Sequence, residues 1–396
     1  MTTVHHQTFA VPYAFDVHFT RDVFAPDNES LVKAMKPALG GRPARALVYI
    51  DEGTVRQSPK LIHAIHLWFA AHEADGVQLA AAPEIVTGGE TLKGEIAILD
   101  KVGRACFDNG ICRHSYIIII GGGAVLDAVG FAASIVHRGI RQIRLPTTVL
   151  AQCDAGLGVK NGVNRFGSKN FYGTFTPPSS IINDARFLES LDDRSWRAGI
   201  AEAVKVAIIK DLDFLTELGK RAEQLRARDL STMEWLIERC ALLHLDHITK
   251  AGDPFEQGSS RPLDFGHWSA HRMETLSNHR LLHGEAVAIG VAIDSLYAVG
   301  LGRITEADGY LILSIMHTCG FRLWDEVLDL RDAAGHRAVL IGLTQFREHL
   351  GGELTLAMPE GLGKRSDIHD FDEVLFEQVL VKLKRWRPIP VAGINA

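Results

Sequence analysis

A run of isoleucines that leads into three glycines constrains the fold of this chain more than any other feature. Residues Tyr116-Ile-Ile-Ile-Ile120 are apolar without a break, and Gly121-Gly-Gly123 follows at once, before an alanine-rich stretch. A continuous apolar run of this length is typical of a strand that is buried on both faces of a parallel sheet. Glycines between such a strand and a helix let backbone amides approach a pyrophosphate at the positive end of the helix dipole. A tight structural turn explains a glycine triplet about as well, so the motif needs support from the rest of the chain.

Two further short segments predict strands of the same sheet. Residues 46–50 end at Asp51-Glu52-Gly53, and residues 143–146 end at Thr147-Thr148. Helical periodicity lies between these runs, for example over residues 62–70, and strands that alternate with helices predict a Rossmann-like parallel sheet. Residues 11–24 hold alternating segments and predict a hairpin at the sheet edge.

The composition of the chain changes beyond about Asp192. Helical spacing without intervening strand-like runs is found in segments 197–227, 231–250, 284–300 and 304–320. We therefore predict an α/β chain with a Rossmann-like parallel-sheet domain over residues 1–190 and a mainly α-helical domain over residues 191–396. A length of 396 residues is sufficient for two such domains with a shared cleft.

Composition excludes several classes of partner and compartment. A net charge of −6 argues against nucleic acid or an anionic membrane as the main partner. The five cysteines form no Cys-x-x-Cys pair, which favours reduced thiols over a disulfide framework. The N-terminal residues lack the basic and apolar regions of a signal peptide, and the longest apolar runs are too short to span a bilayer. These observations predict a soluble, cytoplasmic protein.

Histidines in the second half of the chain are candidate metal ligands. His267 and His271 are four residues apart and share one face of a helix, while His283 opens a separate apolar stretch. Two imidazoles from separate elements and one carboxylate would form a three-ligand metal site with an open position. The plainer interpretation of the histidines alone is that they are polar residues at helix starts. The plainer interpretation of Glu202 and Lys205 is a salt-bridged pair. When the three side chains are considered together, Glu202 is the candidate anionic ligand beside His267 and His283.

The segment from Asp154 to Asn170 is a candidate anion-binding element. It contains Lys160 and Lys169, three asparagines and four glycines within seventeen residues, and it is not amphipathic. A solvated loop is one interpretation; a cradle of backbone amides and lysines for an anionic substrate is the one that we favour. Asp51 follows a predicted strand and is placed to bind the hydroxyls of an adenosine ribose. Asp127 lies one turn into the helix after the glycines and is placed to orient a nicotinamide or a ribose. Either acid could instead be a helix cap.

Seven motifs in a fixed order resemble one enzyme family. They are the strand with GGGxxxD, Arg138-Gly139, Pro146-Thr-Thr, the segment from Asp154 to Asn170, Glu202-x-x-Lys205, GHxxxH and HGEAVAIG. Over residues 45–350 the chain resembles the sugar phosphate cyclases, the superfamily of 3-dehydroquinate synthase. The resemblance implies that the first domain binds NAD and that the second binds one divalent metal ion, with zinc expected and cobalt as an alternative. It also implies a homodimer in which Arg138 reaches the substrate phosphate of the neighbouring subunit.

The resemblance assigns the remaining site residues by motif. The implied NAD contacts are Asp51, Glu90, Lys93, Gly122, Gly123, Asp127, Thr147, Thr148, Lys160 and Lys169. The implied metal ligands are Glu202, His267 and His283. The implied substrate and catalytic residues are Asp154, Lys160, Asn170, Lys205, Asp264, His271 and Arg138.

The sequence departs from dehydroquinate synthases where those enzymes hold the substrate carboxylate. Their Asn is Asp264 here, and their carboxylate-binding Arg falls at Ser260, with Arg261 displaced by one residue. Their carboxylate-binding Lys falls at Asp246 on a gapless count. Valiolone-type cyclases, which act on sedoheptulose 7-phosphate, share the Asp and lack the clamp, but they carry Pro where His271 stands. The expected substrate is therefore a C7 ketose phosphate without a carboxylate, with sedoheptulose 7-phosphate as the leading candidate.

The implied reaction is a phosphate-eliminating cyclisation, which makes the protein a carbon–oxygen lyase. NAD oxidises the substrate transiently, phosphate is eliminated, the hydride returns, and an intramolecular aldol addition closes a cyclitol of the valiolone type. Three alternatives remain: a 3-dehydroquinate synthase, a metal-dependent polyol dehydrogenase and a binding protein without activity. The dehydrogenases usually carry Gly-Thr-Gly-Ser after Pro-Thr-Thr, whereas this chain has Val149-Leu-Ala-Gln-Cys-Asp154.

Overall fold

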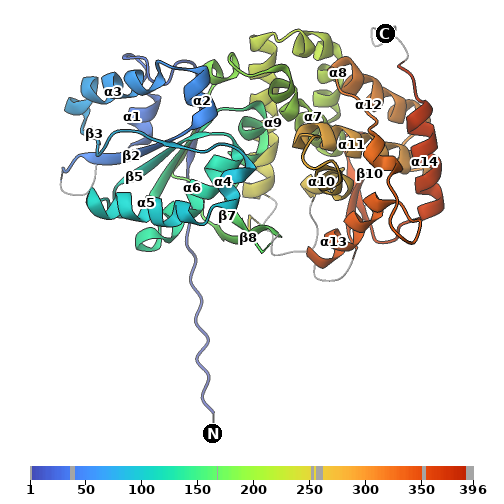
Figure 1. Cartoon of the computed structure of the whole chain (residues 1–396), viewed down its shortest axis with the longest axis horizontal. Coiled ribbons are helices and arrows are strands. Elements are labelled where there is room, and N and C mark those ends of the chain that lie inside the picture. Colours follow the sequence, from blue (N-terminus) through green and yellow to red (C-terminus); the bar gives the residue numbers. More distant parts are fainter. Residues whose placement is uncertain are drawn as a thin grey trace.

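A parallel β-sheet forms the core of the N-terminal half of the molecule. The computed structural model describes residues 2–35, 41–166, 168–250, 254–255, 262–349 and 354–388. Within these residues seven strands form one sheet in the order β1–β9–β6–β5–β2–β3, with β4 also paired to β2, and every pairing is parallel (Figure 1). The strands are β1 Asp16–Thr20, β2 Ala44–Asp51, β3 Val77–Leu79, β4 Glu84–Val86, β5 Tyr116–Gly121, β6 Arg141–Pro146 and β9 Ser180–Asp184. The predicted Rossmann-like sheet is confirmed.

Helices cover both faces of this sheet, which explains the unbroken apolar run of β5. Ile118 and Ile120 pack in a cluster with residues of α1 and α3, whereas Ile117 and Ile119 pack with residues of α5 and α6. Successive side chains of a strand point to opposite faces, so a strand covered on both sides must be apolar at every position. The helices of this half are α1 Ser30–Ala34, α2 Glu52–Gln57, α3 Leu61–Ala71, α4 Glu90–Gly94, α5 Ala97–Asp108 and α6 Gly123–Ile135.

The edge of the sheet differs from the predicted hairpin over residues 11–24. Strand β1 lies at the edge, but it pairs in parallel with β9, so that Asp16 is opposite Ser180. The pattern correctly placed a strand at the sheet edge, and every residue of β1 is exposed or partly buried. The pattern does not report the pairing partner, and the hairpin prediction was wrong.

The segment from Asp154 to Asn170 is not a loop but most of an antiparallel hairpin. Strand β7 spans Lys160–Arg165 and pairs with β8, Ser168–Phe175. The buried guanidinium of Arg144 on β6 donates to the carbonyl of Gly158 at 2.7 Å and to the side-chain oxygen of Asn161 at 2.7 Å. A buried arginine that is bonded in this way fixes the base of the hairpin against the sheet.

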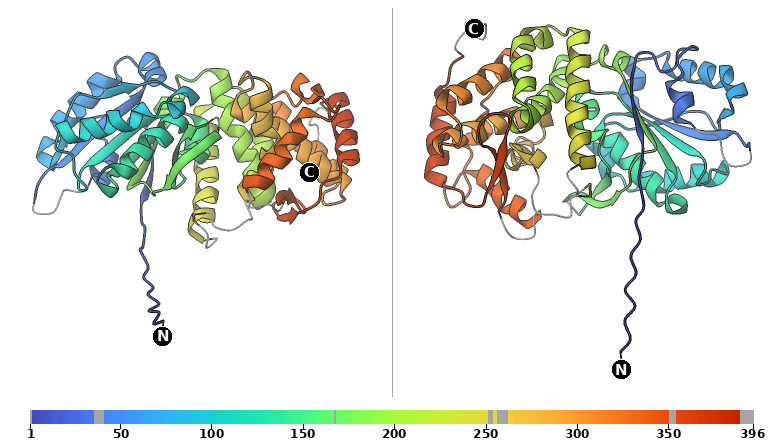
Figure 2. Two further views of the ribbon diagram at one scale, coloured as in Figure 1. Left: turned by 60° about the horizontal axis from the view of Figure 1, so that its bottom comes forward. Right: turned by 180° about the vertical axis from the view of Figure 1, so that it is seen from behind.

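The C-terminal half is mainly helical, as predicted (Figure 2). Its helices are α7 Asp193–Lys210, α8 Leu212–Arg226, α9 Leu230–Lys250, α10 His267–Leu276, α11 His283–Gly300, α12 Glu306–Thr318, α13 Ile341–His349 and α14 Glu373–Arg385. A small hairpin of β10 Leu356–Pro359 and β11 Arg365–Ile368 was not predicted. The first helix of this half starts at Asp193, and the domain division at residues 190 and 191 stays a prediction.

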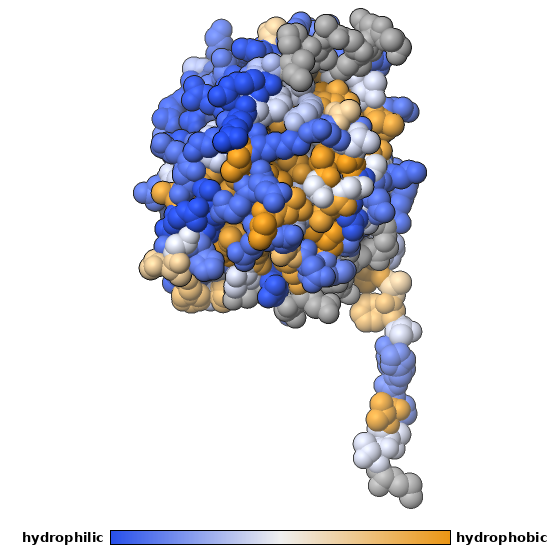
Figure 3. Space-filling model, turned by 90° about the vertical axis from the view of Figure 1, so that its right-hand side faces the viewer, coloured by the Kyte–Doolittle hydropathy of each residue, from blue (hydrophilic) through white to orange (hydrophobic). Residues whose placement is uncertain are grey.

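Two surface features complete the fold. The outer face of α14 exposes Val374 and Val381 among polar side chains (Figure 3). The segment before β1 is extended and points away from the body of the molecule (Figure 1). In the part of the chain that the structure describes, no helix is both long and apolar enough to cross a membrane.

Candidate metal and cofactor site

Close packing around helix α11 brings the predicted metal ligands together. A Cβ atom on Gly284 would lie 2.3 Å from the carbonyl oxygen of Ala198 in α7, and one on Gly290 would lie 2.0 Å from the carbonyl oxygen of Gly266. Only glycine permits such approach of two backbones. Because Gly284 follows His283 and Gly266 precedes His267, the first contact holds His283 against α7 and the second holds His267 against α11.

The carboxylate of Glu202 on α7 faces both imidazoles. Its Oε1 atom lies 3.4 Å from Nε2 of His267 and 3.3 Å from Nε2 of His283. Its Oε2 atom lies 2.5 Å from Nζ of Lys205. Glu202 is 1% exposed, and among the described residues neither of its oxygens has a hydrogen-bond partner of normal geometry.

These distances fit a tetrahedral divalent metal site. Bonds of about 2.0–2.1 Å at tetrahedral angles separate two ligand atoms by roughly 3.3–3.4 Å. The two carboxylate–imidazole distances of 3.4 and 3.3 Å agree with that separation. The donor set, one carboxylate and two imidazoles, is also one that zinc accepts. The role of the three side chains as metal ligands stays a prediction.

The charges around the cluster favour a cation. Burial by itself would raise the pKa of Glu202, but Lys205 and His267 outweigh it and hold that pKa well below its usual value. Burial would lower the pKa of His283, yet the carboxylates of Glu202 and Glu274 raise it to about 10. Two carboxylates thus draw positive charge to the His283 ring, and a divalent cation would meet the same demand.

His271 lies beside the cluster and offers a second set of three ligands. Its ring centre is 5.3 Å from that of His267 and 5.7 Å from that of His283, and the three histidines have ligand atoms within 4.8 Å of one another. Desolvation and the two neighbouring imidazoles lower the pKa of His271 well below its usual value. The geometry alone therefore allows either Glu202 or His271 as the third ligand.

Further side chains fix the orientation of the two imidazoles. His267 Nδ1 lies 3.1 Å from the carbonyl oxygen of Phe265, which turns Nε2 toward Glu202. Asp294 accepts hydrogen bonds from the amide of Gly266 at 3.0 Å and from Nε1 of Trp268 at 2.9 Å. Sequence analysis missed Asp294, although an acid within the apolar helix that follows His283 was a usable signal, because buried acids need partners.

The predicted NAD residues gather at the carboxyl ends of neighbouring strands. Asp51 ends β2 and Gly121 ends β5, and parallel sheets bind ligands at this edge, where the strand order reverses. A Cβ atom on Gly88 would lie 2.5 Å from Oδ2 of Asp51, so the loop after β4 passes closely over that carboxylate. Asp51 also accepts the amide of Thr54 at 3.1 Å, so it caps helix α2 as well.

The other predicted NAD residues surround the glycine turn. Gly122 and Gly123 begin α6, and the buried Thr147 contacts Thr54 through their hydroxyls at 3.2 Å. Thr148 accepts the amide of Ala151 at 3.1 Å. Lys93 pairs with Asp127 at 2.7 Å, and Glu90 accepts from Asn164 at 3.1 Å. Burial raises the pKa of Asp127 although Lys93 opposes it.

Several predicted substrate residues lie between the hairpin and the helices. Asp154 pairs with the buried His244 of α9 at 3.1 Å, a partner that sequence analysis missed because nothing in the helical pattern distinguishes it. Lys205 is buried, and its pKa is raised because the carboxylates of Glu202 and Asp154 outweigh the effect of burial. Asp264 is half-buried in the turn before His267.

The hairpin carries the remaining predicted substrate residues. Lys160 is exposed at the start of β7. Lys169 Nζ lies 3.5 Å from Oε1 of Glu274, and the amide of Asn170 donates to Asn164 at 2.9 Å.

Some predicted residues lie away from this site within a single chain, and others lie outside the described residues. Arg138 is exposed at the far end of α6, about 20 Å from the glycine turn at the usual helical rise. Asp246 lies on the exposed side of α9 and pairs with Lys250 at 2.7 Å. Ser260 and Arg261 lie outside the described residues.

Comparisons with known proteins find relatives along nearly the whole chain. A family model described as 3-dehydroquinate synthase N-terminal matches residues 84–198, and one described as 3-dehydroquinate synthase C-terminal matches residues 199–337. The 2-epi-valiolone synthase of Actinosynnema mirum is 31% identical over 377 residues, which cover 93% of this chain and 94% of that protein. The 3-dehydroquinate synthase of Shewanella sp. (strain MR-4) is 30% identical over 297 residues, 75% of this chain and 80% of that protein.

A solved structure has the same fold. ValA, the 2-epi-5-epi-valiolone synthase of Streptomyces hygroscopicus subsp. jinggangensis 5008, whose structure contains NAD+ and Zn2+, superposes with a TM-score of 0.80 at 28% identity. The match covers 96% of this chain and 99% of that one. It therefore extends over both the parallel sheet and the helical half.

Proposed function

The chain belongs to the 3-dehydroquinate synthase family of sugar phosphate cyclases, and from this premise we propose that it cyclises a C7 ketose phosphate with the help of NAD and one divalent metal ion. The expected substrate is sedoheptulose 7-phosphate, and the expected product is a valiolone-type cyclitol. The observation that carries the proposal is the placement of Glu202, His267 and His283, with carboxylate–imidazole distances of 3.3–3.4 Å, beside Lys205 and the hairpin.

Two separate groups of residues would hold the two cofactors. Glu202, His267 and His283 would hold the metal ion, for which we propose zinc, with cobalt as an alternative. The turn at Gly122 and Gly123 would hold the NAD pyrophosphate. When bound, the metal ion polarises substrate oxygens and NAD supplies reversible hydride transfer without net redox. The proposal is supported by ValA, which is 28% identical and was solved with NAD+ and Zn2+.

Side chains of the protein would supply charges and hydrogen-bond acceptors around the substrate. Lys205 holds Oε2 of Glu202, which leaves Oε1 to face the imidazoles. Desolvation and the neighbouring imidazoles hold the pKa of His271 well below its usual value, so its imidazole is neutral near pH 7 and can accept a hydrogen bond from a substrate hydroxyl. Asp154 is oriented by His244 and can accept a hydrogen bond from another hydroxyl.

Local charge favours a substrate without a carboxylate. Asp246, the gapless counterpart of the carboxylate-binding lysine, lies on the exposed side of α9 and pairs with Lys250, so it supplies no cation for a substrate carboxylate. Asp264 places a negative charge close enough to Lys205 to raise the pKa of that lysine. A buried carboxylate without a partner would cost about 2–5 kcal/mol.

A comparison of two substrates tests the proposal. Phosphate release should be faster from sedoheptulose 7-phosphate than from the carboxylated heptulosonate at equal metal and NAD concentrations. Faster turnover of the carboxylated sugar would make the protein a dehydroquinate synthase. Net NADH formation with a polyol would make it a dehydrogenase. NMR of the product then distinguishes 2-epi-valiolone from 2-epi-5-epi-valiolone, the products named for its two valiolone-type relatives.

A further inference from the structure

The far side of the His283 ring contacts a carboxylate that none of the predicted roles uses. Nε2 of His283 faces Glu202, so Nδ1 points the other way, and it lies 3.2 Å from Oε2 of Glu274. Glu274 stands on α10 seven residues after His267 and three after His271, which places it on the same helix face. It is 6% exposed, and a carboxylate is rarely buried to this extent unless it is paired.

The second oxygen of the same carboxylate reaches the N-terminal half. Oε1 of Glu274 lies 3.5 Å from Nζ of Lys169 on β8. Lys169 belongs to the hairpin that carries Lys160 and Asn170, two predicted substrate residues. One buried side chain therefore connects a predicted metal ligand with the element expected to hold the anionic parts of the cofactor and substrate.

We propose that Glu274 is a positioning residue that orients His283 for the metal ion and ties the β7–β8 hairpin to the metal centre through Lys169. The inference rests on the proposed function in one respect, namely that Glu202, His267 and His283 bind a divalent cation. By accepting a hydrogen bond from Nδ1–H, Glu274 fixes the tautomer in which Nε2 of His283 carries the free lone pair.

The link has a thermodynamic consequence. With the cation bound, His283 is held in place, Glu274 is held by His283, and Lys169 has a fixed counter-charge. Without the cation, the ring can reorient and the ion pair to Lys169 loses its anchor. Binding of the metal ion should therefore protect the hairpin from local opening, and an interaction of this kind is reciprocal, so an ordered hairpin should also favour metal binding.

Titration with Co2+ alone tests the orienting role. Glu274→Gln, which keeps the shape of the side chain, should raise the Kd for Co2+ by about 10–100-fold and change the visible absorption spectrum of bound Co2+. The Gln variant should unfold at a temperature close to that of the wild type. If it folds poorly, Glu274→Asp keeps the charge, shortens the reach and is expected to weaken binding as well. A variant with wild-type Kd and spectrum would overturn the orienting role.

Hydrogen exchange tests the link to the hairpin. Co2+ should slow exchange in peptides that cover residues 160–175 of the wild type, and Lys169→Met should abolish this protection and raise the Kd for Co2+ by the factor through which the ordered hairpin favours metal binding, because the coupling is reciprocal. Persistence of the protection in both the Lys169 and the Glu274 variants would overturn the link. If the wild-type protein binds no Co2+, the metal centre of the proposed function fails instead, so the two failures are distinguishable.

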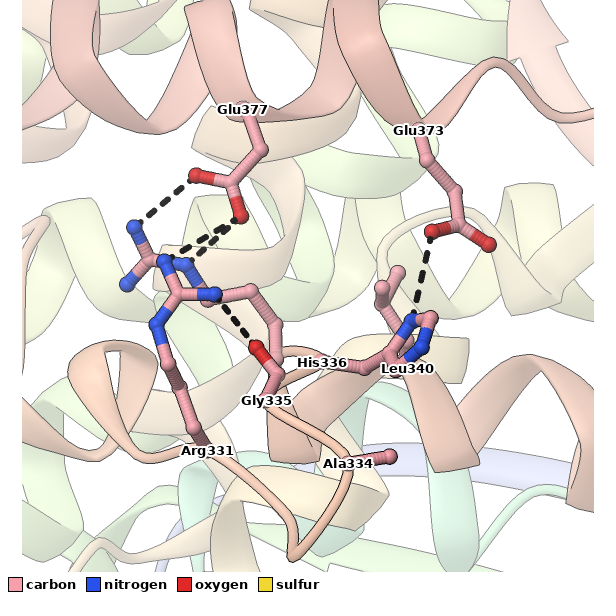
Figure 4. A pocket seen from close by; sticks show the side chains of 8 residues that line it. Arg331, Ala334, Gly335, His336, Leu340, Glu373 and Glu377 are labelled. Carbon is pink, nitrogen blue, oxygen red and sulfur yellow. Dashed lines mark hydrogen bonds and ion pairs between the residues drawn. The ribbon is translucent and has the colours of Figure 1, made fainter.

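Another glutamate–histidine pair provides a matched control. Glu373 on α14 lies 3.9 Å from Nδ1 of His336 in a small surface pocket that Arg331 and Glu377 also line (Figure 4). Both members of this pair are 61% exposed, and neither belongs to the candidate site. Glu373→Gln should change neither the Kd for Co2+ nor the exchange of the hairpin. A change as large as that of Glu274→Gln would overturn the assignment of the effect to Glu274.

Discussion

The two oxygens of Glu202 have different environments, and this difference is the basis of the metal assignment. Oε2 contacts the ammonium of Lys205, while Oε1 faces His267 and His283. A carboxylate that is 1% exposed and has no normal hydrogen bond among the described residues is costly unless a cation is nearby. Lys205 compensates one oxygen, and a divalent ion would compensate the other.

Substitution of the histidines should separate ligands from substrate residues. His267→Ala removes a predicted ligand and should abolish most bound metal and activity. His271→Ala should retain metal and lose activity, because its role is assigned to the substrate. Metal content after dialysis, measured alongside phosphate release, checks both variants. A full metal equivalent in His267→Ala would overturn the ligand assignment, and loss of metal in His271→Ala would place His271 rather than Glu202 in the ligand set.

Asp51 should determine the choice of dinucleotide. Its carboxylate at the end of β2 would accept hydrogen bonds from the ribose hydroxyls of NAD and repel the 2′-phosphate of NADP. Wild-type protein should bind NAD far more tightly than NADP, and Asp51→Ser should reduce that preference. Asp51 also caps α2 through Thr54, and because serine caps a helix about as well as aspartate, the variant should unfold at a temperature close to that of the wild type. Comparable affinity of the wild type for both cofactors, measured by calorimetry, would remove Asp51 from this role.

At the scale of elements, the contact between α11 and its neighbours determines whether the site exists. Gly284 and Gly290 are six residues apart, and each removes a side chain where another backbone passes. The helix could not otherwise lie near both α7 and the turn at Gly266. The motif HGEAVAIG thus combines one ligand with the two glycines that position it.

Gly290→Ala should damage both stability and metal binding. The added Cβ would lie 2.0 Å from the carbonyl oxygen of Gly266, so α11 or the turn must shift. We expect a loss of about 1–3 kcal/mol in the free energy of unfolding, as for other overpacked sites, and weaker binding of Co2+. Gly103→Ala is the matched control, since its Cβ would meet nothing within 4 Å in the middle of α5 and should leave stability equal or higher. Denaturant unfolding of both variants measures the difference.

At the scale of the whole molecule, Arg138 is the residue that a single chain does not explain. It is exposed with a positive φ of 64° and lies at the end of α6 opposite the glycine turn. We propose that the protein is a homodimer in which Arg138 serves the phosphate site of the neighbouring subunit. The proposal accounts for an arginine that the resemblance assigns to the site and the fold places far from it.

Mixing two inactive variants tests this arrangement. Arg138→Ala and Lys160→Ala should each lack activity alone, because each active site would lack one of the two residues. After unfolding and refolding together, hybrid dimers should regain some activity through the sites that carry both residues. Separately refolded samples serve as controls. A fully active monomer in sedimentation velocity would contradict the proposal.

The sequence by itself determined the central strands, the helical second half and the chemical groups that are available. Four consecutive isoleucines require a strand that is covered on both faces, and the glycines after them require a close approach to the backbone. Both signals can be read from the sequence because each depends on adjacent residues alone. The family motifs also indicated Glu202, His267 and His283, which the structure brings together. The pairing of β1 with β9 could not be predicted, because the pattern within one strand does not report the partner strand.

Only the tertiary structure decided which side chains contact the predicted residues. His244 beside Asp154, Glu274 beside His283 and Arg144 beneath the hairpin each lie on a different element from the group that they contact. In a linear sequence such residues look like ordinary helix or strand positions, since their importance depends on burial and on distances between atoms. A carboxylate or guanidinium removed from water must find a partner, and the fold alone determines which partner is within reach.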